Sequence, residues 1–467
     1  MASAIATEHH SIDFIPLNER YGSPRRLFTL WFSCNLHILG VAAGVLSITS
    51  GLSLVWALVA IALGNALGTV IMAAHSAQGP QLGVPQMIQS RAQFGVIGAG
   101  LPLLAVIVTY VLYSAADGLV IKGTLRSLLP VGDDWALILF ALATLIVAYV
   151  GYELIHRVGK IMTLLSTGLF ASAAVLMFIH PLPGGTLHPP LGHFAGAAFV
   201  LAMTQAAAWS LSYGPYVADY SRYLPADTPP ARTFWATALG CFFGSTLIMA
   251  FGAYLAYQSP TLAASPSDAV AGLFGSGRQI AEWLLVMGVT YGNVMNLYSA
   301  YMSTCTVVSG FNRMTRVGGS FKLAVMTGVM IASTVIAVAS QRNFQSYFSD
   351  ILSAMIYLLV PWSAINLADY YLVRKGSYDI EALFHVHGLY KAYRWRTIAV
   401  FLLGVAAEEP FMSLTFHSGV LAQRIGADIA WAPGVLIPAL LYVLIERGRS
   451  PAPAIAAGSV GGYRPKP

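Results

Sequence analysis

Long apolar runs are the feature that most constrains how this chain can fold. Predominantly apolar stretches of about 20 residues recur along almost its whole length, each long enough to cross the hydrocarbon core of a bilayer as a helix. Only 9% of the residues are charged and 57% are hydrophobic. Soluble domains carry about 25% charged residues, so a water-soluble fold does not fit this composition. The sequence predicts an all-α integral membrane protein.

The apolar runs divide into twelve predicted transmembrane helices joined by polar connections. The three cysteines all fall inside these runs, and we interpret them as small packing residues rather than disulfide partners or metal ligands. The predicted spans cover residues 27–50, 52–75, 96–128, 135–155, 158–180, 194–222, 232–257, 279–309, 320–341, 346–373, 395–417 and 427–447.

Lysine and arginine are distributed unequally between the two sides of the predicted bundle. With the N-terminus inside, 20 of the 25 lie in inner segments, and the outer segments hold five: Lys122, Arg126, Arg278, Arg342 and Arg424. The positive-inside rule then predicts a multi-pass protein of the cytoplasmic membrane with both termini in the cytoplasm. This bias also explains the net charge of +6, so no nucleic-acid partner is predicted.

The spans and connections predict five parts of the chain. The last is rich in proline, glycine and small residues, a composition typical of disorder. The parts are a cytoplasmic segment (1–26), a ten-helix core (27–373), a cytoplasmic loop (374–394), two additional transmembrane helices (395–447) and a disordered cytoplasmic tail (448–467).

Two predicted spans are interrupted at corresponding places. The first contains Gly40 and Gly44, and the sixth contains Gly214–Pro215, where proline removes a backbone donor and clashes with the preceding turn. These spans open two sets of five helices, a pattern typical of an inverted-repeat transporter with a midplane site. Alternatively, these glycines and this proline only allow close helix packing. The first span also carries Asn35 and His37, which a helix lying only in lipid does not need.

Several other polar groups lie at predicted membrane depth, where they are costly and tend to face a cavity or a partner. In the third span Tyr113 and Asp117 are four residues apart, on one helical face. The alternative for Asp117 is a wetted position near the outer end, paired with Lys122. In the eighth span Asn293 and Asn296 offer both donors and acceptors, either to a ligand or to neighbouring helices.

The sixth span combines aromatic and hydroxyl groups just before its break. Trp209 and Ser210 precede Gly214–Pro215, and an aromatic ring beside an unwound segment can stack on a flat ligand or simply fill space. Asp219 and Arg222 lie at the cytoplasmic end, where we interpret them as a gate or a structural ion pair. In the eleventh span Glu408, Glu409 and Pro410 are unusual, and the sequence explains them only as a kink near the outer surface.

Enzyme motifs were also considered. The chain contains no Walker loop, no GxGxxG between a strand and a helix, no HExxH and no metal-binding Cys/His spacing. A membrane-embedded enzyme or receptor would need a catalytic cluster or a large sensing domain, and neither is visible. The sequence therefore predicts a transporter without a cofactor.

Four blocks, in this order, resemble the purine–cytosine permease group of the nucleobase:cation symporter-1 family. They are WFSCNLHILGVAAGVLS in the first span, GPQLGVPQMIQSRAQFG after the second, SYGPYVADYSRYLP in the sixth and GNVMNLYS in the eighth. The resemblance runs from about residue 20 to residue 375. It implies a five-plus-five inverted-repeat (LeuT-like) fold of about twelve helices. It also implies cation-coupled import of a nucleobase or similar small heterocycle by alternating access.

The resemblance also implies roles for individual residues. Family members tend to carry a tryptophan and, four residues later, an amide on the third helix, and Tyr113 and Asp117 occupy these places. A carboxylate only accepts hydrogen bonds, so it suits a ring with two adjacent N–H groups or a protonated ring. A protonated Asp117 would instead mimic the amide. The remaining implied substrate-binding residues are Trp209, Ser210, Asn293, Asn296 and, at the first-helix break, Gly40.

The resemblance leaves the coupling cation and the substrate open. Sodium-coupled relatives use eighth-helix hydroxyls shortly before the first amide, and here only Thr290 is near. The oxygen cage for sodium is thus incomplete, and Asp117 or His37 favours a proton. Asn35 is interpreted as structural or gating. The alternative substrate is a vitamin-like or hydantoin-type ring, and the sequence does not predict an oligomeric state.

Overall fold

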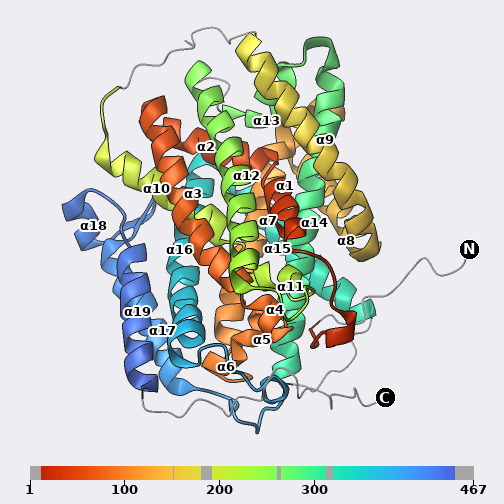
Figure 1. The fold of residues 1–467 in the computed structure, drawn as a ribbon. Coiled ribbons are helices and arrows are strands. Elements are labelled where there is room, and N and C mark those ends of the chain that lie inside the picture. Colours follow the sequence, from red (N-terminus) through yellow and green to blue (C-terminus); the bar gives the residue numbers. More distant parts are fainter. Residues whose placement is uncertain (1–11, 151, 180–191, 260–263, 312–318, 448–467) are drawn as a thin grey trace, which may run out of the picture.

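The computed structural model describes residues 12–150, 152–179, 192–259, 264–311 and 319–447. The tail predicted to be disordered (448–467) lies outside these residues. Long helices packed side by side form one bundle (Figure 1). They are α1 (Arg25–Cys34), α2 (Ile38–Thr49), α3 (Leu54–Ser76), α7 (Gly100–Leu128), α8 (Asp133–Val150), α9 (Tyr152–Ile179), α10 (Gly196–Leu211), α12 (Pro230–Gln258), α14 (Arg278–Phe311), α15 (Gly319–Ser340), α16 (Phe344–Leu367), α17 (Trp395–Glu408) and α19 (Trp431–Glu446).

Short elements connect the long helices. A single π-helical turn extends α16, and the two strands form a two-residue hairpin, a small departure from the all-α prediction. These elements are η1 (Leu17–Glu19), α4 (Gly79–Leu82), α5 (Gln86–Gln89), α6 (Arg91–Phe94), η2 (Gly214–Tyr216), α11 (Val217–Ser221), α13 (Pro266–Gly272), η4 (Gly275–Gly277), η5 (Ala368–Val373), η6 (Glu381–Phe384), η7 (Glu409–Phe411), β1 (Ser413–Leu414), β2 (His417–Ser418) and α18 (Val420–Ile425).

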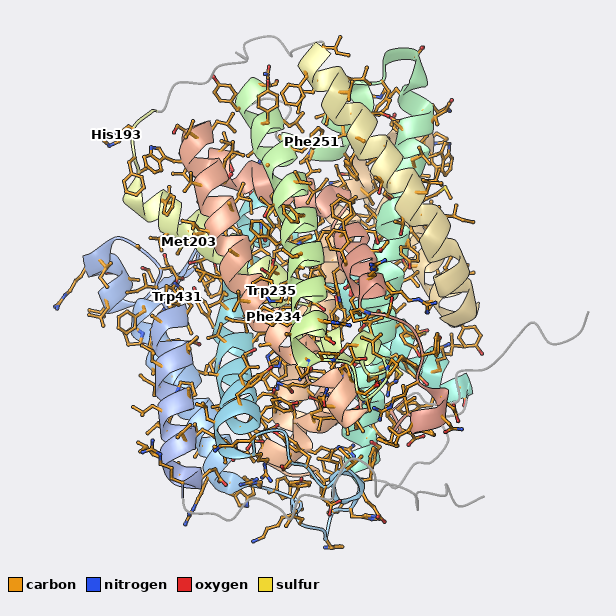
Figure 2. All side chains as sticks on the ribbon, in the orientation of Figure 1. His193, Met203, Phe234, Trp235, Phe251 and Trp431 are labelled. Carbon is orange, nitrogen blue, oxygen red and sulfur yellow. The ribbon has the colours of Figure 1, made fainter. Side chains whose placement is uncertain are left out.

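The outside of the bundle is apolar, as a lipid-facing surface requires. Trp235 of α12 is 59% exposed, and Figure 2 shows it beside Phe234 among many outward-facing side chains. Within the described residues, six helices are long and apolar enough to span a membrane, and the bent pair α1–α2 makes a seventh. Helix α8, the shorter helices α10, α17 and α19 and the more polar α14 account for the further predicted spans, which is consistent with about twelve.

The predicted position of one break and the predicted end of one span are wrong. The first helix does not break at Gly40 and Gly44: α1 ends at Cys34, α2 begins at Ile38, and the two meet at a 64° bend. The eleventh span, predicted to reach residue 417, ends at Glu408 and continues as η7 and the β1–β2 hairpin. Pro410 is the second residue after the helix, where a residue without a backbone N–H favours a stop. The break predicted at Gly214–Pro215 is confirmed, because α10 ends at Leu211 and η2 separates it from α11.

The glycines of α2 serve close packing against α12. A Cβ added to Gly44 would lie 1.9 Å from the carbonyl oxygen of Met249, and one added to Gly252 would lie 2.0 Å from that of Val41. Both glycines therefore let the two backbones touch, as small residues do between membrane helices. The glycines that predicted a break in the first span serve close packing instead, as the alternative interpretation held.

One end of the bundle is filled by the connection after α3. Its helices α4, α5 and α6 lie together at this end (Figure 1), and all but one of their residues are buried. The N-terminal segment packs on the same end, where Ile15 N donates to Gly83 O at 3.0 Å. Arg394 and Glu446, 2.7 Å apart, join the start of α17 to the end of α19 there. Both ends of the described chain therefore lie on one face.

Candidate functional site

The break between α1 and α2 is organised by Asn35, which is fully buried. Its Nδ2 donates to Trp31 O at 2.6 Å, which holds the side chain against the last turn of α1. Its Oδ1 accepts from Trp209 Nε1 at 2.7 Å and from the Tyr213 hydroxyl at 3.2 Å. Trp209 and Tyr213 flank the end of α10, so one amide joins the two broken helices.

Asp117 lies on α7 and is 1% exposed. Its Oδ2 accepts a hydrogen bond from Asn296 Nδ2 of α14 at 3.2 Å, whereas its Oδ1 is buried without a hydrogen-bond partner. Buried polar atoms are almost always satisfied, so an orphaned carboxyl oxygen calls for a ligand or a proton. The alternative pairing with Lys122 is wrong, because Lys122 bonds Asp133 at 2.7 Å.

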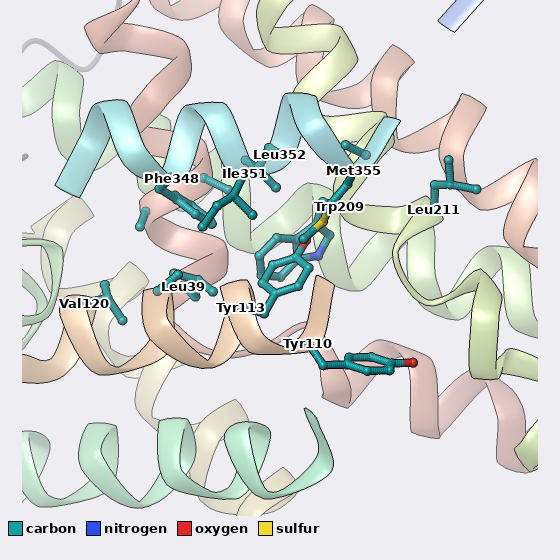
Figure 3. Close-up of a cluster of buried hydrophobic side chains, with 14 of the residues drawn as sticks. Leu39, Tyr110, Tyr113, Val120, Trp209, Leu211, Phe348, Ile351, Leu352 and Met355 are labelled. Atoms are coloured by element: carbon teal, nitrogen blue, oxygen red, sulfur yellow. The ribbon is translucent and has the colours of Figure 1, made fainter. Parts of the chain in front are cut away.

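Aromatic rings surround the next turn of α7. The ring of Tyr113 lies edge-on to Trp209 with centroids 6.0 Å apart, and the Tyr113 hydroxyl donates to Ser212 Oγ at 3.3 Å. Figure 3 shows these two rings between α7 and α16. Just before α2, the His37 ring lies 5.3 Å from that of Trp209, and its Nδ1 is buried without a hydrogen-bond partner. The site thus combines flat apolar surfaces with two unsatisfied polar atoms.

Two predicted site residues are engaged in contacts between helices. Asn293 accepts from Ser114 Oγ at 2.5 Å and donates to Thr144 Oγ1 at 3.2 Å, which joins α14 to α7 and α8. Ser210 donates to Asn65 Oδ1 of α3 at 2.8 Å. Of the two predicted amide residues, Asn296 is the one that reaches Asp117.

The remaining predicted residues lie around this centre. Gly40 is buried inside α2, where an added Cβ would lie 2.8 Å from Ile248 of α12. Thr290 is half-buried on α14, and within the described chain no hydrogen bond joins it to His37 or Asp117. Asp219 Oδ1 accepts from Gln86 N at 2.8 Å, and Arg222 donates to the carbonyl oxygens of Asp219 and Asp13. These last two residues fasten the short helices α4–α6 and the N-terminal segment.

Both approaches to the site are packed with side chains that sequence reasoning missed. On one side Trp31 contacts the rings of Tyr213, Tyr216 and Tyr220 at centroid distances of 5.4 to 6.1 Å. On the other side α16 contributes buried apolar residues facing α7 (Figure 3). The aromatic spacing of YGPYVADY was a usable signal for the first side. No such signal exists for the side covered by α16, because it depends on contacts between helices that are far apart in the sequence. Tyr113, Asp117 and Trp209 are accordingly buried in this structure.

The comparisons with known proteins bear on this arrangement. Residues 14–432 match the family model described as permease for cytosine/purines, uracil, thiamine, allantoin. The chain belongs to this family. Its members are permeases, so this chain is a transporter in the cell membrane and not an enzyme.

Individual relatives agree with the family assignment. The chain is 39% identical to YxlA of Bacillus subtilis, assigned as a purine-cytosine permease, over 95% of this chain and 96% of that protein. It is 25% identical to the purine-cytosine permease fcyB of Emericella nidulans, over 96% of this chain and 89% of that one.

Solved structures establish the fold. Inward-facing Mhp1 matches with a TM-score of 0.75 at 17% identity, over 96% of this chain and 95% of that one. Mhp1 closed with a bound hydantoin, described as a nucleobase-cation-symport-1 family transporter, matches with a TM-score of 0.72. The five-plus-five inverted-repeat fold predicted from the sequence is confirmed.

Proposed function

We propose that this permease imports an amino-substituted nucleobase, of the purine or cytosine type, together with a proton. The carrying observation is Asp117: a buried carboxyl with one oxygen on Asn296 and the other unpartnered, one turn from the Tyr113–Trp209 aromatic pair. The rings favour a flat heterocycle. The family model and the B. subtilis and E. nidulans relatives support a nucleobase.

The protonation state of Asp117 decides which ring edge fits. An ionised carboxylate accepts two hydrogen bonds and suits a base with adjacent N–H groups, such as a 2-amino-6-oxopurine, or a protonated base. A protonated carboxyl offers one donor and one acceptor, which suits an amino group beside a ring nitrogen. The ring edges that fit the ionised and the protonated carboxyl both include an amino group. A hydantoin has no amino group outside its ring, so it offers neither edge.

Asp117 and His37 support proton coupling, because each has a buried titratable atom without a hydrogen-bond partner. We propose that Tyr113, Asp117, Trp209 and Asn296 bind the substrate. We further propose that the face carrying α4–α6 is cytoplasmic, because the predicted inner lysines and arginines gather in the segments that pack there.

The test is a ligand screen and uptake assay on the wild-type protein and the Asp117→Asn variant. We expect thermal stabilisation by amino-substituted bases and not by hydantoins, which lack an amino group outside the ring. The amide in Asp117→Asn cannot release a proton. We therefore expect uptake to fall at least about 10-fold either for bases with adjacent N–H groups or for bases with an amino group beside a ring nitrogen, and the pH profile of uptake to flatten. Lys122→Gln, which alters a nearby charge outside the site, is the control. Unchanged transport and pH profile in Asp117→Asn would contradict the proposal. Uptake that collapses when sodium is removed at fixed pH would contradict proton coupling.

A further inference from the structure

Glu408, at the end of α17, is a buried carboxyl far along the chain from the substrate site. It is 0% exposed, and both its oxygens lack a hydrogen-bond partner. The carboxyl lies against Gly434 of α19, where an added Cβ would fall 1.7 Å from Glu408 Oε1. A side chain at position 434 would therefore displace the carboxyl. The glycine leaves room for an acid group that nothing else in the described protein binds.

A second carboxyl, Asp428, is near enough to Glu408 for the two charges to affect each other, and it accepts three hydrogen bonds. Its Oδ2 accepts from the Tyr357 hydroxyl and from Ser413 N, and its Oδ1 accepts from Ala430 N at 3.0 Å. These donors come from α16, from the β1–β2 hairpin and from the start of α19. The three hydrogen bonds favour the charged form of Asp428 and its burial opposes that form, whereas Glu408 is buried and has no donor.

The other charged groups nearby are already engaged. Asp350 of α16 bonds Thr415, and Glu409 lies 3.0 Å from His417 at the exposed hairpin. Arg394 and Glu446 pair at the opposite end of α17 and α19. None of these contacts reaches a Glu408 oxygen. An ionised Glu408 would thus face Asp428 without compensation, and buried groups in that position take up a proton instead.

We propose that Glu408 is a proton-binding site of this transporter, separate from Asp117. With its proton bound, Glu408 packs against Gly434, and Asp428 holds α16 to α17 and α19 through Tyr357. When the proton leaves to water, the new carboxylate repels Asp428 and loosens this contact. The outer part of α16 carries Phe348, Ile351 and Leu352 over the Tyr113–Trp209 pair (Figure 3). Proton release at Glu408 therefore shifts the cover of the substrate site.

The direct test is infrared titration of the full-length protein reconstituted in liposomes, without substrate. We expect a protonated-carboxyl band that disappears as the pH rises, that is absent in Glu408→Gln and that persists in Glu409→Gln. Glu409 is the matched control because it is adjacent, exposed and paired with His417. A spectrum of Glu408→Gln identical to that of the wild type would overturn the proposal.

A second variant keeps the test decisive if Glu408→Gln does not fold. Asp428→Asn removes the neighbouring negative charge, so the Glu408 band should disappear at a lower pH than in the wild type. An unchanged midpoint would overturn the pairing of the two carboxyls.

Transport supplies an independent readout. It is the one part of the test that rests on the proposed function. Glu408→Gln mimics the protonated state, so we expect this variant to lose the change in uptake that the wild type shows as the pH rises through the midpoint of the infrared band, with Glu409→Gln following the wild type. A wild-type pH profile in Glu408→Gln would show that proton binding there does not affect transport. Because the infrared band is read without substrate, failure of the nucleobase proposal would leave that result intact.

Discussion

At the scale of single residues, Asn35 does the most to connect the two halves of the fold. One amide donates to α1 and accepts from both Trp209 and Tyr213, so the ends of two broken helices share it. Neither aromatic residue can adjust without changing the contact with α1. A substrate held against Trp209 would therefore act on both broken helices together.

We expect Asn35→Ala to lower both stability and uptake. The change leaves the Trp209 N–H and the Tyr213 hydroxyl without this acceptor, and a buried unsatisfied donor costs about 1–3 kcal/mol. The apparent melting temperature should fall and uptake should drop by about 10-fold or more, the second effect reflecting the misplaced Trp209 ring. Asn343→Ala is the control, because Asn343 is exposed and makes no capping hydrogen bond. Equal behaviour of the two variants would contradict the role assigned to Asn35.

Residue chemistry was predictable from the sequence, but residue partners were not. Helical spacing placed Tyr113 and Asp117 on one face, and polarity at membrane depth singled out Asn293 and Asn296. Only the fold shows that Asn296 reaches Asp117 while Asn293 bonds Ser114 and Thr144. These contacts join residues about 150 to 180 positions apart, and no local pattern encodes such pairings.

At the scale of elements, the same residue type can have opposite structural effects. Glycine can free a backbone or let two backbones touch, and only the neighbouring helix decides between these. In α10–α11 the Gly214–Pro215 pair marks a true break because proline removes a donor. In α2 the glycines belong to a regular helix, and the break lies at Asn35–His37, where the sequence contains no glycine or proline. Hydropathy thus predicts the spans well and places their interruptions poorly.

Gly44→Ala should separate α2 from α12 and prevent stable folding. Its methyl group would need space now occupied by Met249 backbone atoms at 1.9 to 2.8 Å, and a backbone cannot rotate away as a side chain can. We expect little or no monodisperse protein by fluorescence-detected size-exclusion chromatography. Gly328→Ala in α15 meets no atom within 4 Å and should be neutral or slightly stabilising, since alanine favours a helix by up to about 1 kcal/mol over glycine. A well-folded Gly44→Ala protein would show that the helices are not in backbone contact.

At the scale of the whole molecule, alternating access requires the end filled by α4–α6 to open. Arg91 of α6 is 2% exposed and donates to Leu383 O at 3.2 Å, Thr306 O at 2.9 Å and Ser309 Oγ at 2.8 Å. One guanidinium thus fastens the filled end both to α14 and to the loop that precedes α17. Its several donors in a fixed fork explain how it reaches three acceptors at once.

Removing this fastening should favour the conformation open at the α4–α6 end. In Arg91→Ala the three acceptors lose their donor, so closed states become less stable while open states, which lack these contacts, are unaffected. Cys34, the last residue of α1, packs in the same cluster as Trp31, Tyr213 and Tyr216, so its reactivity reports the opening when Cys241 and Cys305 are replaced by serine. We expect Cys34 to react with a maleimide about 10-fold faster in Arg91→Ala, with slower net uptake. Arg232→Ala, at an exposed site on α12, should label at the original rate. Equal labelling rates in the two variants would show that Arg91 does not hold this end closed.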